Sequence, residues 1–181
     1  MSDTHILLLV ISLAFILFIV VPLTWLLITI KSFERLENEI KEALISLNSV
    51  LITFYEVFMK TFKDCQSKLN LNGELLIEVN NFECIKLDDE FSVKQQFVYD
   101  FLKLIVKVQT FIETNENILN DPLYLECLDK TKKELETLHA SRRVYNAIVS
   151  YFNQKRVTFP DNIVAKLKKL KNYPFFETEL L

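Results

Sequence analysis

One long apolar segment constrains this chain more than any other feature. Residues 6–30 are apolar except for Ser12, Thr24 and Thr29, and they include Pro22 in their later half. A helix over this segment extends about 37 Å, longer than the roughly 30 Å hydrocarbon core of a bilayer, so it would cross with some tilt. Serine and threonine hydroxyls bond to carbonyls of their own helix, which makes the proline tolerable. The sequence therefore predicts a single transmembrane helix over residues 6–30.

The flanks of the segment distinguish a retained anchor from a cleaved signal peptide. No lysine or arginine precedes the segment, it is longer than the apolar region of a signal peptide, and no small-x-small cleavage pattern follows before Lys31. We therefore expect a signal-anchor. Because Lys31, Arg35 and Lys41 follow the helix closely, the positive-inside rule places residues 1–5 outside and the rest of the chain in the cytoplasm.

The residue types on which most enzymes depend are scarce. The single glycine, Gly73, excludes a P-loop, a dinucleotide-binding G-x-G-x-x-G and a G-x-S-x-G nucleophile elbow. The two histidines, His5 and His139, and three cysteines without C-x-x-C spacing leave too few ligands for a zinc site. Unpaired cysteines (Cys65, Cys84 and Cys127) also agree with a reducing compartment. A net charge of −3 argues against nucleic acid, so we expect no catalysis, cofactor, metal or nucleic-acid partner.

Apolar positions spaced three and four residues apart predict long helices after the anchor. The first stripe starts at Phe33, continues the anchor helix without a break, and comprises Leu36, Ile40, Leu44, Leu47, Leu51, Phe54, Phe58, Phe62, Cys65 and Leu69. Residues 70–73, with Asn70 and Asn72, form the first stop signal. Residues 74–90 allow either a short hairpin or a broken helix, and we favour the helix because the rest is helical. Another helix begins at about Phe91, and its two apolar stripes predict more than one packing neighbour.

The most regular pattern follows Asp121 and Pro122, a pair typical of a helix start because the carboxylate can cap free N–H groups and proline fits the first turn. Gaps of four and three residues then join Tyr124, Leu128, Thr131, Leu135, Leu138, Arg142, Tyr145, Val149 and Phe152. Phe159-Pro160 ends this helix, and a shorter helix is expected at 162–171. Such a seam belongs to a coiled coil or bundle. The predicted fold is all-α: one transmembrane helix that continues into an antiparallel bundle of three to four long helices.

This part of the chain resembles the C-terminal signature of the LemA family. The resemblance rests on Asn120-Asp121-Pro122-Leu123-Tyr124, Ala140-Ser141-Arg142-Arg143-Val144-Tyr145-Asn146, Val149, Tyr151-Phe152-Asn153, Phe159-Pro160-Asp161-Asn162, Ala165 and Phe175-Phe176-Glu177. It is close over roughly residues 120–177 and extends to layout only before that. The resemblance implies a bacterial, single-pass protein of the cell (inner) membrane with a helical-bundle domain, and it implies no catalytic activity.

The chain departs from the family pattern on its first long helix and just before the arginine pair. Members usually carry an arginine pair followed by Asp-Leu-Ile-Pro-Asn-Leu-Val on that helix, and residues 49–62 contain neither. The usual glutamate before the C-terminal arginine pair is replaced by Leu135, with Glu134 and Glu136 beside it. A family role that depends on these residues is therefore in question for this chain.

Two basic groups are candidate contacts for a partner or for lipid. Arg142 lies on the apolar seam, where it either packs its stem on the core and pairs with a carboxylate or, with Arg143, binds an acidic partner or a phospholipid headgroup. Four lysines, Lys166, Lys168, Lys169 and Lys171, precede Tyr173, Phe175 and Phe176 and resemble a basic-aromatic membrane-surface element. The alternative is that these lysines complement a helix C-terminus and that the two phenylalanines close the end of the bundle.

The signature residues with expected structural roles are Tyr145, Asn146, Phe152, Asn153, Phe159, Pro160, Asn162, Phe175 and Phe176. Buried phenol and amide groups need hydrogen-bond partners, so we expect Tyr145 and Asn146 to serve packing and bonds between helices.

Together these features predict a non-enzymatic, membrane-anchored scaffold or adaptor at the bacterial membrane. Its partner would be a membrane or membrane-proximal protein, or a second copy of the chain. Two alternatives stay open: a binder of anionic lipid surfaces through residues 166–176, and an accessory subunit of a membrane peptidase or transporter. The expected organisation is a short tail (1–5), the anchor (6–30), a helical-bundle domain (31–177) and a C-terminal tail (178–181).

Overall fold

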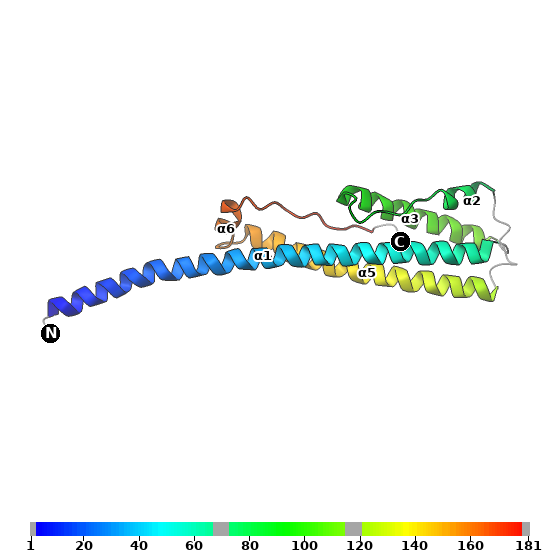
Figure 1. The fold of residues 1–181 in the computed structure, drawn as a ribbon. Helices are drawn as coiled ribbons and strands as arrows, with labels where there is room; N and C mark the ends of the chain where they lie inside the picture. Colours follow the sequence, from blue (N-terminus) through cyan, green and yellow to red (C-terminus); the bar gives the residue numbers. More distant parts are fainter. Residues whose placement is uncertain (1–2, 67–72, 115–120, 179–181) are drawn as a thin grey trace. The chain divides into compact units, whose positions relative to one another are not determined.

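The computed structural model describes residues 3–66, 73–114 and 121–178. Within these ranges the chain forms helices α1 (Asp3–Gln66), α2 (Gly73–Asn80), α3 (Phe91–Glu113), α5 (Pro122–Val157) and α6 (Asn162–Leu167) (Figure 1). No strand occurs in them, and the all-α prediction is confirmed. The predicted end of the first stripe at Leu69, the stop signal at Asn70 and Asn72, and residues 115–120 and 179–181 lie outside the described residues.

Helix α1 joins the apolar segment to the following stripe without interruption, as predicted. Pro22 is its one internal proline, and on the turn beside it Thr24 Oγ1 lies 2.9 Å from both the Val20 and the Val21 carbonyl oxygens. Such hydroxyl contacts help a helix tolerate a proline. The N-terminal part of α1 is long and apolar enough to cross a membrane, with a mean hydropathy of 2.7 in its most apolar window, and residues 10–24 are exposed. The helix is therefore compatible with a single-pass anchor.

The chain folds into two compact units. Unit 1 comprises Met1–Ile40 with Ile148–Pro174, and unit 2 comprises Lys41–Ala147 with Phe175–Leu181. Helices α1 and α5 each contribute to both units.

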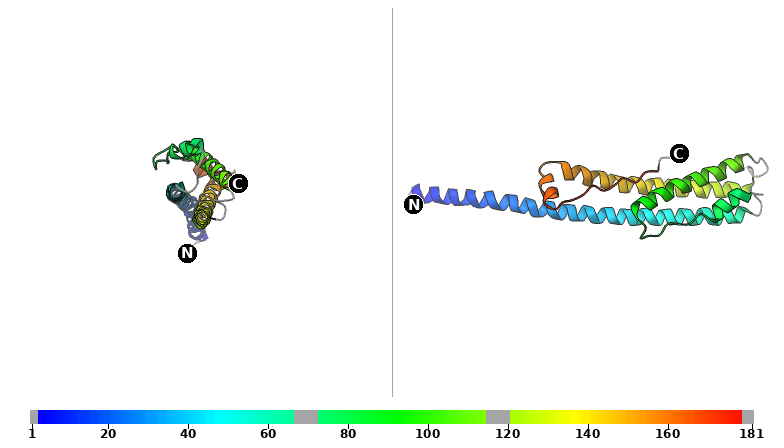
Figure 2. Two further views of the ribbon diagram at one scale, coloured as in Figure 1. Left: turned by 90° about the vertical axis from the view of Figure 1, so that its right-hand side faces the viewer. Right: turned by 90° about the horizontal axis from the view of Figure 1, so that it is seen from above.

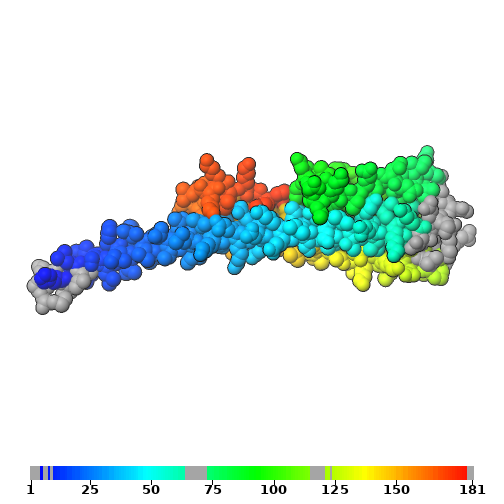
Figure 3. Space-filling view, viewed as in Figure 1, coloured from blue at the N-terminus to red at the C-terminus, as the bar shows by residue number. Residues whose placement is uncertain are grey.

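The core of unit 1 is a small aromatic stack between α1, α5 and the segment after α6. Phe152 packs edge-on against Phe33 at 5.6 Å between ring centroids and against Tyr173 at 5.1 Å. Lys155 Nζ lies 5.5 Å from the centroid of the Phe33 ring. In the space-filling view, the orange and red atoms of the α6 region lie directly against α1 (Figure 3).

In unit 2, helices α1, α3 and α5 lie side by side (Figure 2), and aromatic rings pack between α1 and α3. Phe101 of α3 contacts Phe54 at 5.1 Å and Phe58 at 5.4 Å. Tyr55 contacts Phe97 at 6.2 Å, and further along α1 the residues Thr61 and Phe62 line a pocket with Val108 and Ile112. Residue numbers therefore rise together along α1 and α3, and these two helices are parallel. Helix α5 runs antiparallel to both (Figure 1).

The ambiguous segment 74–90 explains how α3 comes to run parallel to α1. Only Gly73–Asn80 is helical, so the helix prediction is wrong for residues 81–90. Tyr55 Oη donates to the Phe82 carbonyl oxygen at 2.7 Å, and Lys94 Nζ donates to the Leu87 carbonyl oxygen at 2.8 Å. These side chains take up backbone acceptors that a helix or hairpin would otherwise satisfy. The irregular segment carries the chain back along the bundle, so that Phe91 at the start of α3 packs beside Tyr145 of α5 at 6.2 Å.

The seam on α5 is confirmed by burial. Tyr124, Thr131, Leu138, Tyr145, Val149 and Phe152 are buried, and Leu128, Leu135 and Arg142 are half-buried. Helix α5 begins at Pro122, as predicted, and ends at Val157, just before Phe159-Pro160. Helix α6 ends at Leu167, earlier than the expected 171.

Candidate functional site

The segment that carries the four candidate lysines folds onto α1 where the apolar run ends. Asp161, which precedes α6, pairs with Lys155 Nζ at 3.0 Å through Oδ2 and accepts a hydrogen bond from Thr29 Oγ1 at 3.4 Å through Oδ1. Thr29 is buried although Leu27 and Ile28, which precede it in the apolar run, are exposed. Asp161 therefore ties the end of α5 and the start of α6 to the last turn of the predicted membrane segment.

A second contact fixes the other end of α6 to α1. Lys168 Nζ lies 2.6 Å from Glu34 Oε1, with both side chains partly exposed. An exposed pair of this kind contributes little stability, but it shows which turn of α1 faces this lysine. Lys166, Lys169 and Lys171 are exposed and make no ion pair within the described part of the chain.

The end of α6 has the hydrogen bonds of a Schellman motif. The Leu170 N–H donates to the Ala165 carbonyl oxygen at 3.0 Å, and the Lys169 N–H donates to the Lys166 carbonyl oxygen at 3.1 Å. Lys169 has φ 53°, the left-handed conformation in which glycine usually stands at this position. This turn ends α6 before residue 171.

An open cleft of about 320 Å³ lies between the end of α5 and α6, and it is lined by Arg156, Val157, Asn162, Ala165, Lys166, Lys169 and Leu170. Arg156 Nη1 lies 3.4 Å from the Leu170 carbonyl oxygen. Arg156 Nε and Asn162 Oδ1 are buried and have no hydrogen-bond partner among the described residues. The cleft therefore contains three cationic side chains, those of Arg156, Lys166 and Lys169. Two of its polar atoms, one on Arg156 and one on Asn162, have no hydrogen-bond partner among the described residues.

The chain after α6 is held by side-chain carboxamides that pair with its backbone in two directions. Asn153 donates to the Tyr173 carbonyl oxygen at 2.9 Å and accepts from the Tyr173 N–H at 3.1 Å. Asn146 donates to the Phe176 carbonyl oxygen at 2.9 Å and accepts from the Phe176 N–H at 2.8 Å. Gln95 of α3 pairs with Glu177 in the same way, accepting from its N–H at 2.9 Å and donating to its carbonyl oxygen. The expected bond from Asn146 to another helix is therefore a bond to the C-terminal segment.

The spacing of the two asparagines matches the segment that they hold. Seven residues separate them on α5, a rise of about 10 Å, and three residues of extended chain between Tyr173 and Phe176 span about the same distance.

The aromatic residues near the lysines have different environments. Phe176 is fully buried and packs edge-on against Phe91 at 5.7 Å, whereas Phe175 is exposed. Burial, with a smaller contribution from the charge of Glu37, raises the pKa of Tyr173. Of the aromatic residues in the candidate element, the structure therefore leaves only Phe175 at the surface.

The two candidate arginines lie on the unit 2 part of α5. Arg142 is half-buried and its Nε has no hydrogen-bond partner among the described residues, whereas Arg143 is exposed. Burial, together with the charges of Arg142 and Arg143, lowers the pKa of His139. The expected carboxylate partner of Arg142 is not found within the described ranges.

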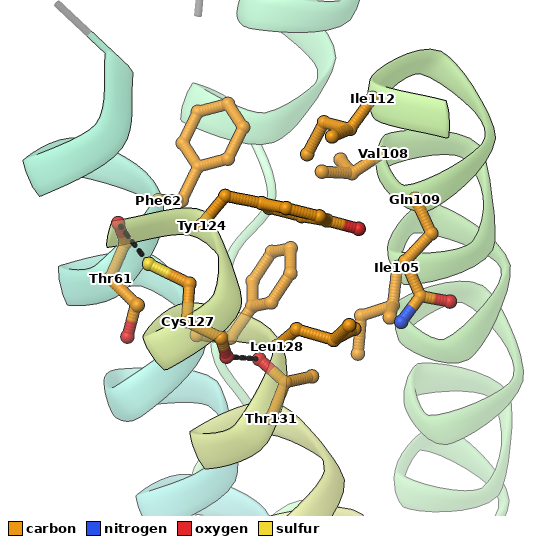
Figure 4. Close-up of a pocket in the computed structure, with 11 residues that line it drawn as sticks. Thr61, Phe62, Ile105, Val108, Gln109, Ile112, Tyr124, Cys127, Leu128 and Thr131 are labelled. Carbon is orange, nitrogen blue, oxygen red and sulfur yellow. Dashed lines mark hydrogen bonds between the residues drawn. The ribbon is translucent and has the colours of Figure 1, made fainter. Parts of the chain in front are cut away.

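An apolar pocket lies among α1, α3 and α5 of unit 2, where the Tyr124 ring extends from α5 toward α3 (Figure 4). Cys127 Sγ lies 3.7 Å from the Thr61 carbonyl oxygen and Thr131 Oγ1 lies 2.9 Å from the Cys127 carbonyl oxygen. The free space is about 40 Å³, little more than the share of one water in the liquid.

The remaining candidates for chemistry are the Cys84 thiol and groups of metal-binding side chains. Burial, with a smaller contribution from Glu56, raises the pKa of Cys84, which disfavours its thiolate. No group of three histidine, cysteine or acidic side chains with metal-binding geometry occurs in the described ranges.

The sequence interpretation missed the residues that position this region. Thr29 lies in the apolar run, and its partner Asp161 is 132 residues away, so no local pattern links them. Arg156 lies four residues after Phe152, at the next position of the α5 seam, so extending the seam by one step would have identified it. Gln95 lies in no motif, and its partner Glu177 is 82 residues away, so the sequence did not single it out either. One available signal was a polar residue, Thr29, close to the end of an apolar segment.

The sequence model of the LemA family matches residues 24–180. No curated protein and no solved structure matches the chain.

Proposed function

The chain belongs to the LemA family, and from this premise we propose that it acts as a membrane-anchored scaffold or adaptor. In this proposal α1 crosses the bacterial inner membrane once, and unit 2 presents the surfaces of its helices to a partner protein in the cytoplasm. The protein performs no catalysis of its own.

The uninterrupted helix α1 is the observation that carries the proposal. Its apolar part is exposed over residues 10–24 and its continuation is buried in the core of unit 2 at Leu47, Leu51 and Phe54. One hydrogen-bonded helix therefore passes from the lipid-compatible segment into the bundle. A helix that is covalently continuous from an anchor into a bundle keeps the bundle attached to the membrane, which is what a scaffold requires.

The surface of unit 2 offers apolar contacts on its long helices. Ile45 on α1, Tyr99 on α3 and Val144 on α5 are exposed. Single exposed apolar residues are common on soluble domains, so we use them as positions for testing and not as proof of an interface. Non-enzymatic action is supported by the composition, since the single glycine and two histidines leave little of what the common catalytic motifs require.

Site-specific photo-crosslinking in the native membrane tests the scaffold proposal. A photoreactive amino acid at Ile45, Tyr99 or Val144 should give a recurrent crosslinked protein, and one at Phe18 in the anchor should not. Replacing residues 6–28 by an unrelated membrane helix keeps Thr29 and should preserve the bundle crosslinks. Crosslinks only from Phe18, lost after the replacement, would instead identify an accessory subunit of a membrane enzyme or transporter.

Two further outcomes would contradict the proposal. A reproducible hydrolase or transferase activity that disappears with one exposed-residue substitution would make the protein an enzyme. Labelling of an Ile45→Cys variant in intact cells by a membrane-impermeant thiol reagent would place the bundle outside the cytoplasm.

A further inference from the structure

The corner between α5 and α6 exposes several large apolar side chains. Phe159 is 76 % exposed and Leu167 is 70 % exposed, and Val157 and Ile163 are also exposed. Four such side chains within eleven consecutive residues are unusual for a soluble surface, where large apolar patches mark interaction sites.

This corner lies next to the end of the apolar run of α1. Its contacts to α1 are the hydrogen bond from Thr29 to Asp161 and the ion pair of Glu34 with Lys168. Residues 29–34 begin where the apolar segment ends, so a membrane crossed by residues 6–30 would have its headgroup layer at this turn of the helix. The exposed apolar side chains of α6 therefore sit at the depth of the boundary between acyl chains and headgroups.

Cationic groups accompany the apolar side chains. Arg156, Lys166 and Lys169 line the cleft between α5 and α6, and the buried Arg156 Nε has no partner among the described residues. A guanidinium Nε–H and two ammonium groups suit a phosphate oxygen. Asn162 Oδ1 is an acceptor in the same cleft, which suits a hydroxyl group of the ligand and would oppose a bare phosphate.

Lysines that combine with exposed apolar side chains are typical of elements that lie in a membrane interface, where long side chains reach the headgroups. We propose that the α5–α6 corner is a lipid-binding collar: Phe159 and Leu167 enter the outer acyl region, and the cleft of Arg156, Lys166 and Lys169 binds the phosphate of an anionic phospholipid. The collar rests on the membrane anchoring proposed above and adds a specific lipid contact to it. It also fixes the depth and rotation of α1, because Asp161 and Lys168 attach it to that helix.

Fluorescent labels on single cysteines test the depth of the collar. The full chain, with its native cysteines replaced by serine, carries Phe159→Cys or Leu167→Cys labelled with an environment-sensitive dye, in vesicles that contain lipids with a nitroxide near the headgroup. We expect strong quenching at both positions. Leu125→Cys, an exposed leucine on the unit 2 part of α5, is the matched control and should not be quenched. Unquenched labels at 159 and 167 would overturn the proposal.

A label at Phe18 separates failure of the collar from failure of the anchor. Phe18 is exposed in the middle of the apolar run and should be quenched by lipids with a nitroxide deep in the acyl chain. Deep quenching at Phe18 without quenching at 159 and 167 would refute the collar alone. Absence of quenching at Phe18 would refute the anchor and the collar together.

Lipid retention tests the charge of the cleft. The full chain is purified from nanodiscs of mixed phosphatidylcholine and phosphatidylglycerol, and bound lipid is identified by native mass spectrometry. We expect the wild type to retain phosphatidylglycerol and the Lys166→Gln/Lys169→Gln variant to lose most of it. Lys132→Gln/Lys133→Gln, at two exposed lysines of α5 in unit 2, should retain it as the wild type does.

Two outcomes of the retention experiment and one of the labelling experiment would overturn the assignment. Equal retention by both double variants would remove the cleft as the site. Complete displacement of the lipid by inorganic phosphate would make it a site for free anions. Labels at 159 and 167 that are shielded only in native membranes, and never quenched by lipid, would identify a protein partner on this corner.

Discussion

The hydrogen bonds between Asn146 and Phe176 give the sharpest prediction about stability. Asn146→Ala removes a donor and an acceptor at once and leaves the Phe176 N–H and carbonyl oxygen without their partners. These bonds are 2.8 and 2.9 Å long, and Phe176 is fully buried. Water therefore reaches the abandoned groups only if the segment detaches from α5.

The expected cost follows from the two bonds. A neutral hydrogen bond contributes about 0.5–1.5 kcal/mol net, so the local free energy of detachment should fall by about 1–3 kcal/mol. At about 1.4 kcal/mol for each factor of ten, the open state becomes about 5- to 150-fold more populated. Asn146→Asp should lose as much, because it keeps the acceptor but places a carboxylate oxygen against the Phe176 carbonyl oxygen.

Hydrogen exchange measured by mass spectrometry on the C-terminal peptide reads this population directly. The full chain in detergent should exchange at Phe176 faster by the stated factor in Asn146→Ala, while peptides from α3 change little. Asn172→Ala, at an exposed residue of the same segment, is the control. If the two alanine variants exchange alike, the carboxamide pairs do not hold the segment and the reasoning is wrong.

Three other substitutions test separate parts of the fold. Phe152→Asp should cost several kcal/mol in a thermal melt because it buries an unpaired charge in the unit 1 core, whereas Tyr151→Asp, at an exposed neighbour, should melt close to the wild type. Lys169→Gly should stabilise the chain in urea unfolding by about 1 kcal/mol, since φ 53° suits glycine better than lysine; a loss of stability would refute the left-handed turn. The lowered pKa of His139 means that the unfolded chain takes up a proton first, so stability should fall as the pH drops from about 6.5 toward the folded pKa. His139→Gln should flatten that slope, and an unchanged slope would exclude this histidine as its source.

Three signature residues of the C-terminal part, Asn146, Asn153 and Phe176, now have a physical explanation. Asn146 and Asn153 hold the backbone of the segment after α6, and Phe176 inserts its ring beside Tyr145 at 6.5 Å and Phe91 at 5.7 Å. These bonds involve only backbone groups of the held segment and do not depend on its side chains. The asparagines on α5 therefore determine where the segment is held. Phe159 has no such structural role, because its side chain is exposed, and this contrast supports a role at the surface.

Local pattern alone determined most of the helices. A 3.6-residue period reports which side of a helix meets apolar neighbours, and it placed α1, α3 and the seam of α5 because each carries a long stripe. Residues 81–90 have no such stripe, and their conformation is set by acceptors that Tyr55 and Lys94 satisfy from other helices. The hydrophobic periodicity of the sequence therefore could not predict the irregular path of this segment. It also could not predict the parallel direction of α3, which follows from that path.

Residues 166–176 at the candidate site also show which features the sequence determines and which depend on tertiary contacts. The sequence identified the lysines because charge is a property of each residue by itself, and it grouped them with Tyr173, Phe175 and Phe176 because they are adjacent in the chain. Tertiary contacts separate them: Phe176 is buried under its bonds to Asn146, while Asp161 brings α6 to Thr29 across 132 residues. Sequence determines which stretches are apolar, helical or charged, since these properties are local. Only the folded chain decides which of them meet, because a hydrogen bond between distant residues leaves no period in the sequence.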